Sequence, residues 1–137
     1  MHIPIPKNLP STILPIKAFK DNYIWIIIQN NYAVIVDPGE SIQVIEFIEK
    51  NNIYPEAILI THKHFDHIDG VKKLIARYPN IKVYGPAKSK FDFRYKSVQE
   101  NDILVMNKSK LKYKVIEIPG HTLDHVAYLD SDLIFCG

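Results

Sequence analysis

The sequence lacks several features that would place it outside the ordinary soluble globular proteins. It has one cysteine, Cys136, so no disulfide can form within the chain. Its longest apolar run, residues 24–28, is far shorter than the roughly 20 residues that a membrane helix needs. The first ten residues carry three prolines and lack the basic and apolar segments of a secretory signal. We therefore expect a cytoplasmic protein with no membrane partner.

The chain also has little net charge. Lys and Arg number 17 and Asp and Glu number 15, which gives +2. A charge this small argues against nucleic acid as the main partner. The sequence shows no internal repeat, low-complexity tract or flexible linker, and 137 residues suit one domain or a large piece of one. We expect a single domain over residues 1–137, acting as a monomer.

Patterns of apolar residues predict strands first, then alternating helices and strands, then strands again. This order is typical of a layered α/β protein with mixed sheets. Apolar residues at helical spacing predict helices over 41–51 and 68–78. Residues 86–101 are polar and mixed, and their pattern assigns no element. The predicted strands cover 11–19, 23–29, 32–36, 57–60, 82–84, 103–106, 112–118, 125–129 and 133–135.

The strongest chemical signal is the run Thr-His-Lys-His-Phe-Asp-His at residues 61–67, directly after an apolar strand. Residues two apart in an extended segment point the same way, so His62 and His64 can reach one metal ion. Asp66 and His67 follow after the chain turns, and they can face a second ion beside the first. A ligand-rich loop at the end of a buried strand is typical of a metal-dependent hydrolase.

A second cluster, Pro-Gly-His-Thr, contains His121 and also follows a predicted strand. Its sharp turn would bring His121 to the same sheet edge as the first cluster. Three imidazoles, from His62, His64 and His121, together with water match the ligand count of catalytic zinc. Asp66 and His67 are only two ligands for a second ion, so that site needs more.

Other polar residues near these clusters have supporting interpretations. Asp37, in an Asp-Pro-Gly turn, is expected near the same edge, where it would orient the loop or a ligand histidine. His125 is expected to be a supporting or core histidine, and Cys136 a small buried side chain. Asp124 would either pair with His125 or be solvated. The basic and aromatic residues between 88 and 95 are expected to form a solvated loop rather than a nucleic-acid surface.

The run at 61–67 resembles the Thr-His-x-His-x-Asp-His signature of the metallo-β-lactamase superfamily. The Asp-Pro-Gly at 37–39 and the Pro-Gly-His-Thr at 119–122 match its other two motifs in the correct order. The Asp-Asn-Tyr-Ile-Trp segment at 21–25 is similar to one found near the N-terminus of glyoxalase II, the hydroxyacylglutathione hydrolases. The resemblance covers essentially the whole chain, with Asp124 standing where the family usually has glycine.

The resemblance implies an α/β (α+β) fold, the αββα sandwich of that superfamily, with a dinuclear site at the sheet edges. It implies that His62, His64 and His121 bind the first metal. Asp66 and His67 would bind the second and serve catalysis. Zinc, two ions per complete site, is the expected cofactor, and iron or manganese accepts the same ligands. The family's bridging aspartate, last histidine and helical substrate-binding region follow this point, so we expect the C-terminal part of the sandwich to be missing.

The implied reaction is hydrolysis of a glutathione thioester, S-(2-hydroxyacyl)glutathione and typically S-lactoylglutathione, as in methylglyoxal detoxification. A metal lowers the pKa of bound water from about 15.7 to about 7, which supplies hydroxide at neutral pH. Alternatives are a persulfide dioxygenase of the same superfamily with a single iron, and a chain that binds metal without activity. A superfamily nuclease is disfavoured by the small net charge.

Overall fold

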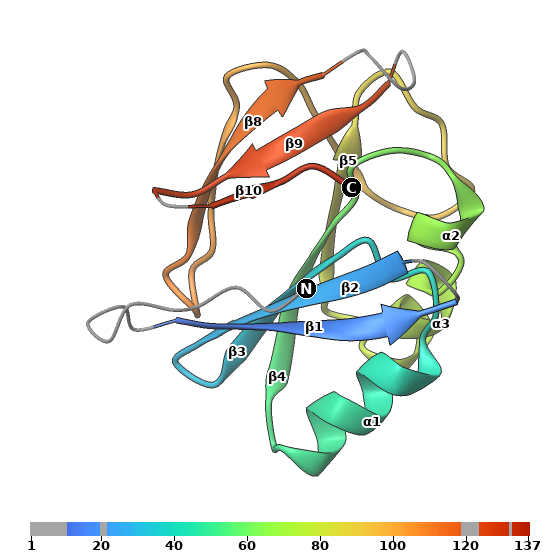
Figure 1. Cartoon of the computed structure of the whole chain (residues 1–137), viewed down its shortest axis with the longest axis vertical. Helices are drawn as coiled ribbons and strands as arrows, with labels where there is room; N and C mark the ends of the chain where they lie inside the picture. The colour runs from blue at the N-terminus through green and yellow to red at the C-terminus, as the bar shows by residue number, and fades with distance from the viewer. Residues whose placement is uncertain (1–10, 20–21, 119–123, 132) are drawn as a thin grey trace.

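The computed structural model describes residues 11–19, 22–118, 124–131 and 133–137, which form two packed sheets with helices beside one of them (Figure 1). The first sheet has the order β1 (Thr12–Ala18), β2 (Asn22–Gln29), β3 (Tyr32–Val36), β4 (Tyr54–Leu59), β5 (Lys82–Pro86) and β6 (Lys96–Val98). The second has the order β10 (Ile134–Phe135), β9 (Val126–Leu129), β8 (Lys112–Glu117) and β7 (Ile103–Val105). The helices are α1 (Ile42–Lys50), α2 (Phe65–Ile68) and α3 (Val71–Arg77).

The first sheet changes from antiparallel to parallel pairing at β3. β1, β2 and β3 pair antiparallel, and Asn30 and Asn31 connect β2 to β3 with φ of 55° and 64°. Two adjacent residues with positive φ are what a tight hairpin turn requires. β3, β4, β5 and β6 pair parallel. The carboxyl ends of these parallel strands therefore share one edge, where α/β proteins usually bind ligands.

Each central strand of the first sheet contributes side chains to two hydrophobic cores, because successive side chains point to opposite faces. In β3, Val34 and Val36 pack between the sheets, while Ala33 and Ile35 face α1 and α3. Figure 1 shows α1 and α3 on the side of the first sheet that faces away from β8, β9 and β10. The described residues thus form three layers, helix–sheet–sheet, and confirm the predicted α/β sandwich.

The outer face of the second sheet is partly apolar. Ile103, Val105 and Ile134 are each at least half exposed on its strands. No helix of the described ranges covers this face, so these ranges contain three of the four layers of an αββα sandwich. None of the described helices is long and apolar enough to cross a membrane.

The structure differs from the prediction at the second helix. Residues 65–77 form two short helices, α2 and α3, instead of one helix over 68–78. Gly70, between them, donates its N–H to the Pro38 carbonyl, and a Cβ there would lie 2.6 Å from the Glu40 carbonyl carbon. The break arises because this turn packs against the backbone of residues 38–41.

Residues 86–101 contain β6 and an aromatic cluster formed by Phe91, Phe93 and Tyr95. The rings of Phe91 and Phe93 stack with centroids 4.9 Å apart, and Tyr95 meets Phe91 edge-on. All three pack against the helix-side core. The expectation of a solvated loop was therefore wrong for these aromatic residues, which bury much of their surface against the protein.

Candidate metal centre

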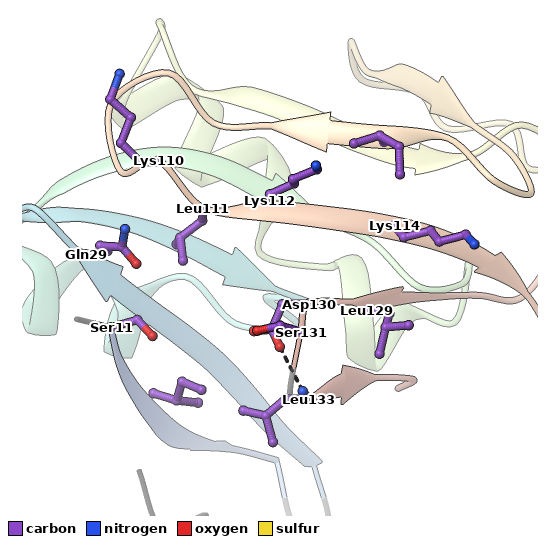
Figure 2. A pocket seen from close by; sticks show the side chains of 12 residues that line it. Ser11, Gln29, Lys110, Leu111, Lys112, Lys114, Leu129, Asp130, Ser131 and Leu133 are labelled. Carbon is purple, nitrogen blue, oxygen red and sulfur yellow. Dashed lines mark hydrogen bonds between the residues drawn. The ribbon is translucent and has the colours of Figure 1, made fainter. Parts of the chain in front are cut away.

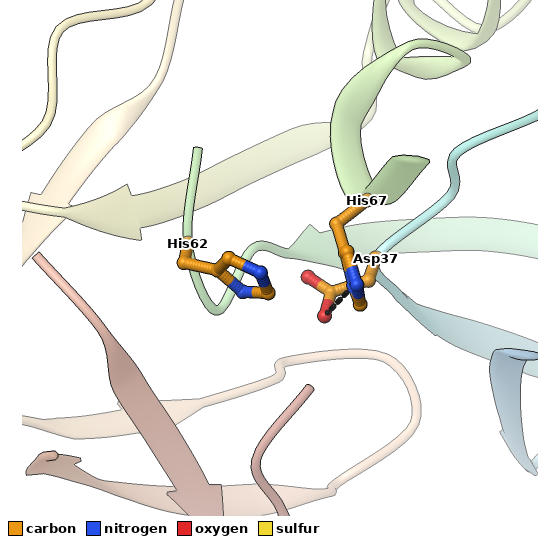
Figure 3. Close-up of side chains that lie close together, drawn as sticks. All are labelled: Asp37, His62 and His67. Carbon is orange, nitrogen blue, oxygen red and sulfur yellow. Dashed lines mark hydrogen bonds and ion pairs between the residues drawn. The ribbon is translucent and has the colours of Figure 1, made fainter. Parts of the chain in front are cut away.

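Three candidate residues meet beyond the carboxyl ends of β3 and β4. Asp37 follows β3, His62 follows β4, and His67 lies on α2; one ligand atom from each lies within 4.8 Å of the others (Figure 3). The ring centroid of His62 is 4.6 Å from that of His64 and 4.3 Å from that of His67. Asp66 Oδ2 lies 3.7 Å from His67 Nε2. The structure therefore brings four of the five predicted ligands together, and His121 lies outside the described residues.

Asp37 organises this edge through its buried carboxylate. It accepts hydrogen bonds from the Thr61 backbone N–H at 2.7 Å and the Thr61 hydroxyl at 2.6 Å. It also lies 2.9 Å from His67 Nδ1, which donates to it (Figure 3). Because Nδ1 is held in this way, Nε2 is the nitrogen that remains for a metal. Asp37 thus orients both the loop and a ligand histidine, as its position in the sequence indicated.

The Asp-Pro-Gly turn has the backbone shape that this arrangement needs. Asp37 has φ of 52°, a left-handed conformation that aspartate tolerates better than most residues. At Gly39 a Cβ would lie 2.0 Å from the Asp66 carbonyl oxygen. Only glycine allows the turn to approach α2 this closely.

His62 is held in its neutral form. Its ring is buried and stacks on His125 with centroids 4.6 Å apart, and the Thr61 hydroxyl lies 2.8 Å from Nδ1. Burial, together with the positive charge of His67, lowers the pKa of His62 to about 4. A metal binds the neutral imidazole, so His62 is ready to act as a ligand at neutral pH.

His67 and Asp66 are shifted in opposite directions. Burial lowers the pKa of His67, but the hydrogen bond and charge of Asp37, with the charge of Asp66, outweigh it and raise that pKa. Burial raises the pKa of Asp66, but the hydrogen bond from Asn22 and the charges of His67 and His64 outweigh it and lower that pKa. The two carboxylates therefore favour a positive charge at His67, and a metal ion at Nε2 supplies one.

The second sheet is attached to the histidine loop by direct hydrogen bonds. The Val126 N–H donates to the Thr61 carbonyl at 2.9 Å, and the buried Tyr128 hydroxyl donates to the Ile60 carbonyl at 2.6 Å. His125 Nε2 lies 2.5 Å from the Cys136 carbonyl oxygen, to which it donates. His125, directly before β9, thus supports the site, in agreement with its predicted role.

One expectation about a neighbouring residue was wrong, and for another the structure excludes one of the two alternatives. Cys136 is exposed, not buried, and Gly137 beside it lies against the site. A Cβ on Gly137 would be 2.5 Å from Thr61 Oγ1 and 3.1 Å from a His62 ring carbon. Asp124 is buried rather than solvated, and it accepts a hydrogen bond from the Ser89 hydroxyl. This contact gives the carboxylate a buried partner where the family usually has glycine.

Asn22 and Thr61 belong to the site but were not assigned to it from the sequence. Asn22 Nδ2 donates to Asp66 Oδ2 at 2.5 Å, and Thr61 bonds to Asp37. Asn22 lies in the segment at 21–25 and Thr61 in the run at 61–67, so only their membership of these motifs indicated a role in the site. Their partners are 44 and 24 positions away, so local pattern could not identify them.

The cavity beside the candidate metal centre is smaller than a second cavity at the opposite end of the first sheet. A cavity of about 220 Å³ adjoins the metal centre and is lined in part by Asp37 and His67. A cavity of about 420 Å³ lies at the opposite ends of the same strands, beside Gln29, Leu111 and Leu133 (Figure 2). No histidine lines the larger cavity within the described part of the chain, so the smaller one is the candidate active site.

The residues at the smaller cavity fit a metal ion. Two ligands that each lie about 2.1 Å from one ion can be at most about 4.2 Å apart, and Asp66 Oδ2 and His67 Nε2 satisfy this limit. Imidazole and carboxylate ligands suit zinc, iron and manganese. Asp37 is close enough to be a ligand, but its oxygens already accept hydrogen bonds from Thr61 and His67. We therefore assign it an orienting role.

A two-sheet sandwich with a histidine–aspartate centre beyond its parallel strands defines the class of the protein. The family model of the metallo-beta-lactamase superfamily matches residues 19–137, so the chain belongs to that superfamily. Within it, the chain is 45% identical over 128 residues to a hydroxyacylglutathione hydrolase of Psychromonas ingrahamii. The match covers 91% of the chain and 49% of that protein, so the chain spans about half the length of the curated relatives it matches.

Solved structures share the fold. ETHE1 from Myxococcus xanthus matches with a TM-score of 0.71 and 20% identity, over 90% of this chain and 55% of that one. TTHA1623, in a di-iron-bound form, matches with a TM-score of 0.70 and 21% identity, over 85% of this chain and 66% of that one. At these identities the likeness shows the fold alone.

Proposed function

We propose that this protein hydrolyses the thioester of S-(2-hydroxyacyl)glutathione, such as S-lactoylglutathione, to glutathione and a 2-hydroxy acid. The observation that carries the proposal is the gathering of His62, His64, Asp66 and His67 at one sheet edge. The identity of 45% to a hydroxyacylglutathione hydrolase supports the choice of substrate. We place the protein in the cytoplasm, as a monomer that detoxifies methylglyoxal and has neither a nucleic-acid nor a membrane partner.

The proposed ligands divide between two ions. His62, His64 and His121 would hold the first, and Asp66 and His67 would contribute to the second. Zinc is the proposed metal, with iron and manganese as alternatives for the same ligand types. When bound, the metal supplies a Lewis acid and a water whose pKa is lowered to about 7.

The residues of the chain prepare the site for this chemistry. Burial keeps His62 neutral, and Asp37 fixes the ring of His67. Gly137 has no side chain to occupy the space beside His62. The leaving thiol has an ordinary pKa of about 8.5 and can depart as a thiolate. The reaction therefore needs no dedicated proton donor from the protein.

Replacement of His64 by alanine tests the proposal. We expect loss of thioesterase turnover with S-lactoylglutathione and reduced metal content, while the far-UV circular dichroism spectrum is retained. His2→Ala is the matched control, because His2 is far in sequence from every motif. Unchanged thioesterase activity in His64→Ala would overturn the proposed site.

A second candidate is a persulfide dioxygenase that uses a single iron. The likeness to ETHE1 fits this alternative in fold, whereas the 45% sequence identity favours the thioester hydrolase. Metal analysis and oxygen consumption with glutathione persulfide separate the two. A chain that binds metal but turns over neither substrate would be a metal-binding module, which calorimetric metal titration would identify.

A further inference from the structure

Asn22 lies beside the metal centre, but the proposed reaction gives it no task. It opens β2, and it lines the cavity of about 220 Å³ together with Tyr23 and Trp25. All three residues belong to the Asp-Asn-Tyr-Ile-Trp segment at 21–25. Asn22 Nδ2 donates a hydrogen bond of 2.5 Å to Asp66 Oδ2. A segment that first indicated only a family thus has a direct contact with a proposed ligand.

Asp66 needs an external contact to fix its side chain. It lies on α2, a helix of four residues in which no side chain is fully buried, and its own side chain is 30% exposed. A helix this short is weakly stabilised by its own hydrogen bonds. A partly exposed carboxylate on such a helix has several accessible rotamers unless a partner selects one. The hydrogen bond from Asn22, the first residue of β2, a strand that is paired on both sides, provides that selection.

The selected orientation is the one that suits a shared metal ion. Asp66 Oδ2 lies 3.7 Å from His67 Nε2, within the span of about 4.2 Å that two ligands of one ion allow. A carboxylate oxygen has two lone pairs, so Oδ2 can accept from Asn22 and still bind a metal. On the other side, Asp37 fixes the ring of His67 through Nδ1. Each proposed ligand of the second ion therefore has its own orienting partner.

We propose that Asn22 is a positioning residue, which holds the Asp66 carboxylate in the orientation that binds the second metal ion together with His67. This inference rests on the proposed assignment of Asp66 as a ligand. The competing explanation is that Asn22 only attaches the start of β2 to α2 and stabilises the fold. The two explanations differ in whether the effect of Asn22 on metal affinity depends on Asp66.

The experiment measures zinc affinity by titration against a competing chelator. Asp66→Ala identifies the zinc equivalent that depends on this carboxylate. For that equivalent, we expect Asn22→Ala to weaken binding by about 10- to 100-fold, the usual effect of losing a partner of a metal ligand. Asn22→Leu keeps the side-chain volume and removes the donor, so it should show the same loss. The melting temperature of the metal-free protein should fall by no more than about 3 °C, because water can replace the lost donor at a carboxylate that is 30% exposed.

Asn51→Ala is the matched control. Its Nδ2 donates to the Phe47 carbonyl at 2.8 Å at the end of α1, before the amino end of β4, whereas the proposed ligands of the 61–67 run follow the carboxyl end of that strand. This variant removes a carboxamide donor of the same kind and should leave zinc affinity within twofold of the wild type. A loss equal to that of Asn22→Ala would overturn the inference.

A double-mutant cycle separates positioning from folding. If Asn22 acts through Asp66, adding Asn22→Ala to Asp66→Ala should change zinc affinity by less than about twofold. An equal loss in both backgrounds would overturn the inference, as would wild-type affinity in both Asn22→Ala and Asn22→Leu. If Asp66→Ala weakens no zinc equivalent, Asp66 is not a zinc ligand in this chain, and the inference fails for that separate reason.

Discussion

Replacing Asp37 with asparagine tests whether a single carboxylate organises the metal centre. Asparagine has nearly the same shape and also tolerates the left-handed conformation that Asp37 adopts at φ of 52°. The substitution therefore adds little backbone strain, whereas alanine would. It removes the negative charge and replaces one acceptor oxygen with an NH₂ group that cannot accept.

The magnitude follows from the three hydrogen bonds that the carboxylate accepts. The remaining oxygen, in the place of Oδ1, can still accept from the Thr61 backbone N–H. The Thr61 hydroxyl and His67 Nδ1 both donate to Oδ2, so both lose their acceptor when NH₂ takes its place. A hydrogen bond to a charged group contributes about 1.5–3 kcal/mol, so losing two should cost about 3 kcal/mol or more. At roughly 3 °C per kcal/mol for a chain of this size, the melting temperature should fall by about 10 °C. Zinc affinity should fall by about 10- to 100-fold, because His67 loses its orienting partner.

Differential scanning calorimetry of the metal-free protein and zinc titration measure the two effects. Asp92→Asn is the control, because that carboxylate is exposed and pairs only with the exposed Lys72 among the described residues. We expect its melting temperature and zinc affinity to match the wild type. An Asp37→Asn protein that melts and binds zinc like the wild type would refute the reasoning.

Three further outcomes are expected. Tyr128→Phe removes the buried hydroxyl that donates to the Ile60 carbonyl and should cost about 1–3 kcal/mol in urea unfolding, whereas equal stability would mean that this bond contributes nothing. Metal-free stability should fall as pH drops from 6.5 towards 4, because the unfolded state protonates His62 first. The pKa difference is 6.5 minus about 4, which corresponds to roughly 3 kcal/mol, and His62→Asn should flatten this dependence. His67 has the opposite effect, because its raised pKa contributes stability below pH 6.5 that is lost as pH rises through that pKa. If the urea midpoints of the wild type and of His62→Asn both stay constant between pH 7 and 4.5, the lowered pKa of His62 is contradicted. Phe91→Ala should lower stability by about 2 kcal/mol, because the ring packs against Phe93 and Tyr95, and zinc affinity should remain unchanged in the same sample.

The sequence predicted those parts of the site that depend on local geometry. His62, His64, Asp66 and His67 follow one strand within six positions, so a strand end and one turn suffice to place them at the same edge. Asp37 was placed there for the same reason, because it directly follows β3. The burial of β3 and of the end of β4 on both faces was likewise visible as continuous apolar runs.

Long-range contacts account for what the sequence could not predict. Asn22 meets Asp66 across 44 positions, and Ser89 meets the buried Asp124 across 35. The break between α2 and α3 depends on the approach of Gly70 to residues 38–41. β6 has three residues, of which only Val98 is buried, so it shows no alternating pattern to recognise.

The hydrogen bonds from Val126 to Thr61 and from Tyr128 to Ile60 have a consequence for the order of folding. They join residues 65 and 68 positions apart, and such distant pairings form slowly because a long loop must close first. The histidine loop is therefore completed only when the second sheet has docked. A metal ion should then bind after the main folding barrier, slowing unfolding while leaving the folding rate nearly unchanged. A bound metal ion would therefore slow the separation of the two docked sheets.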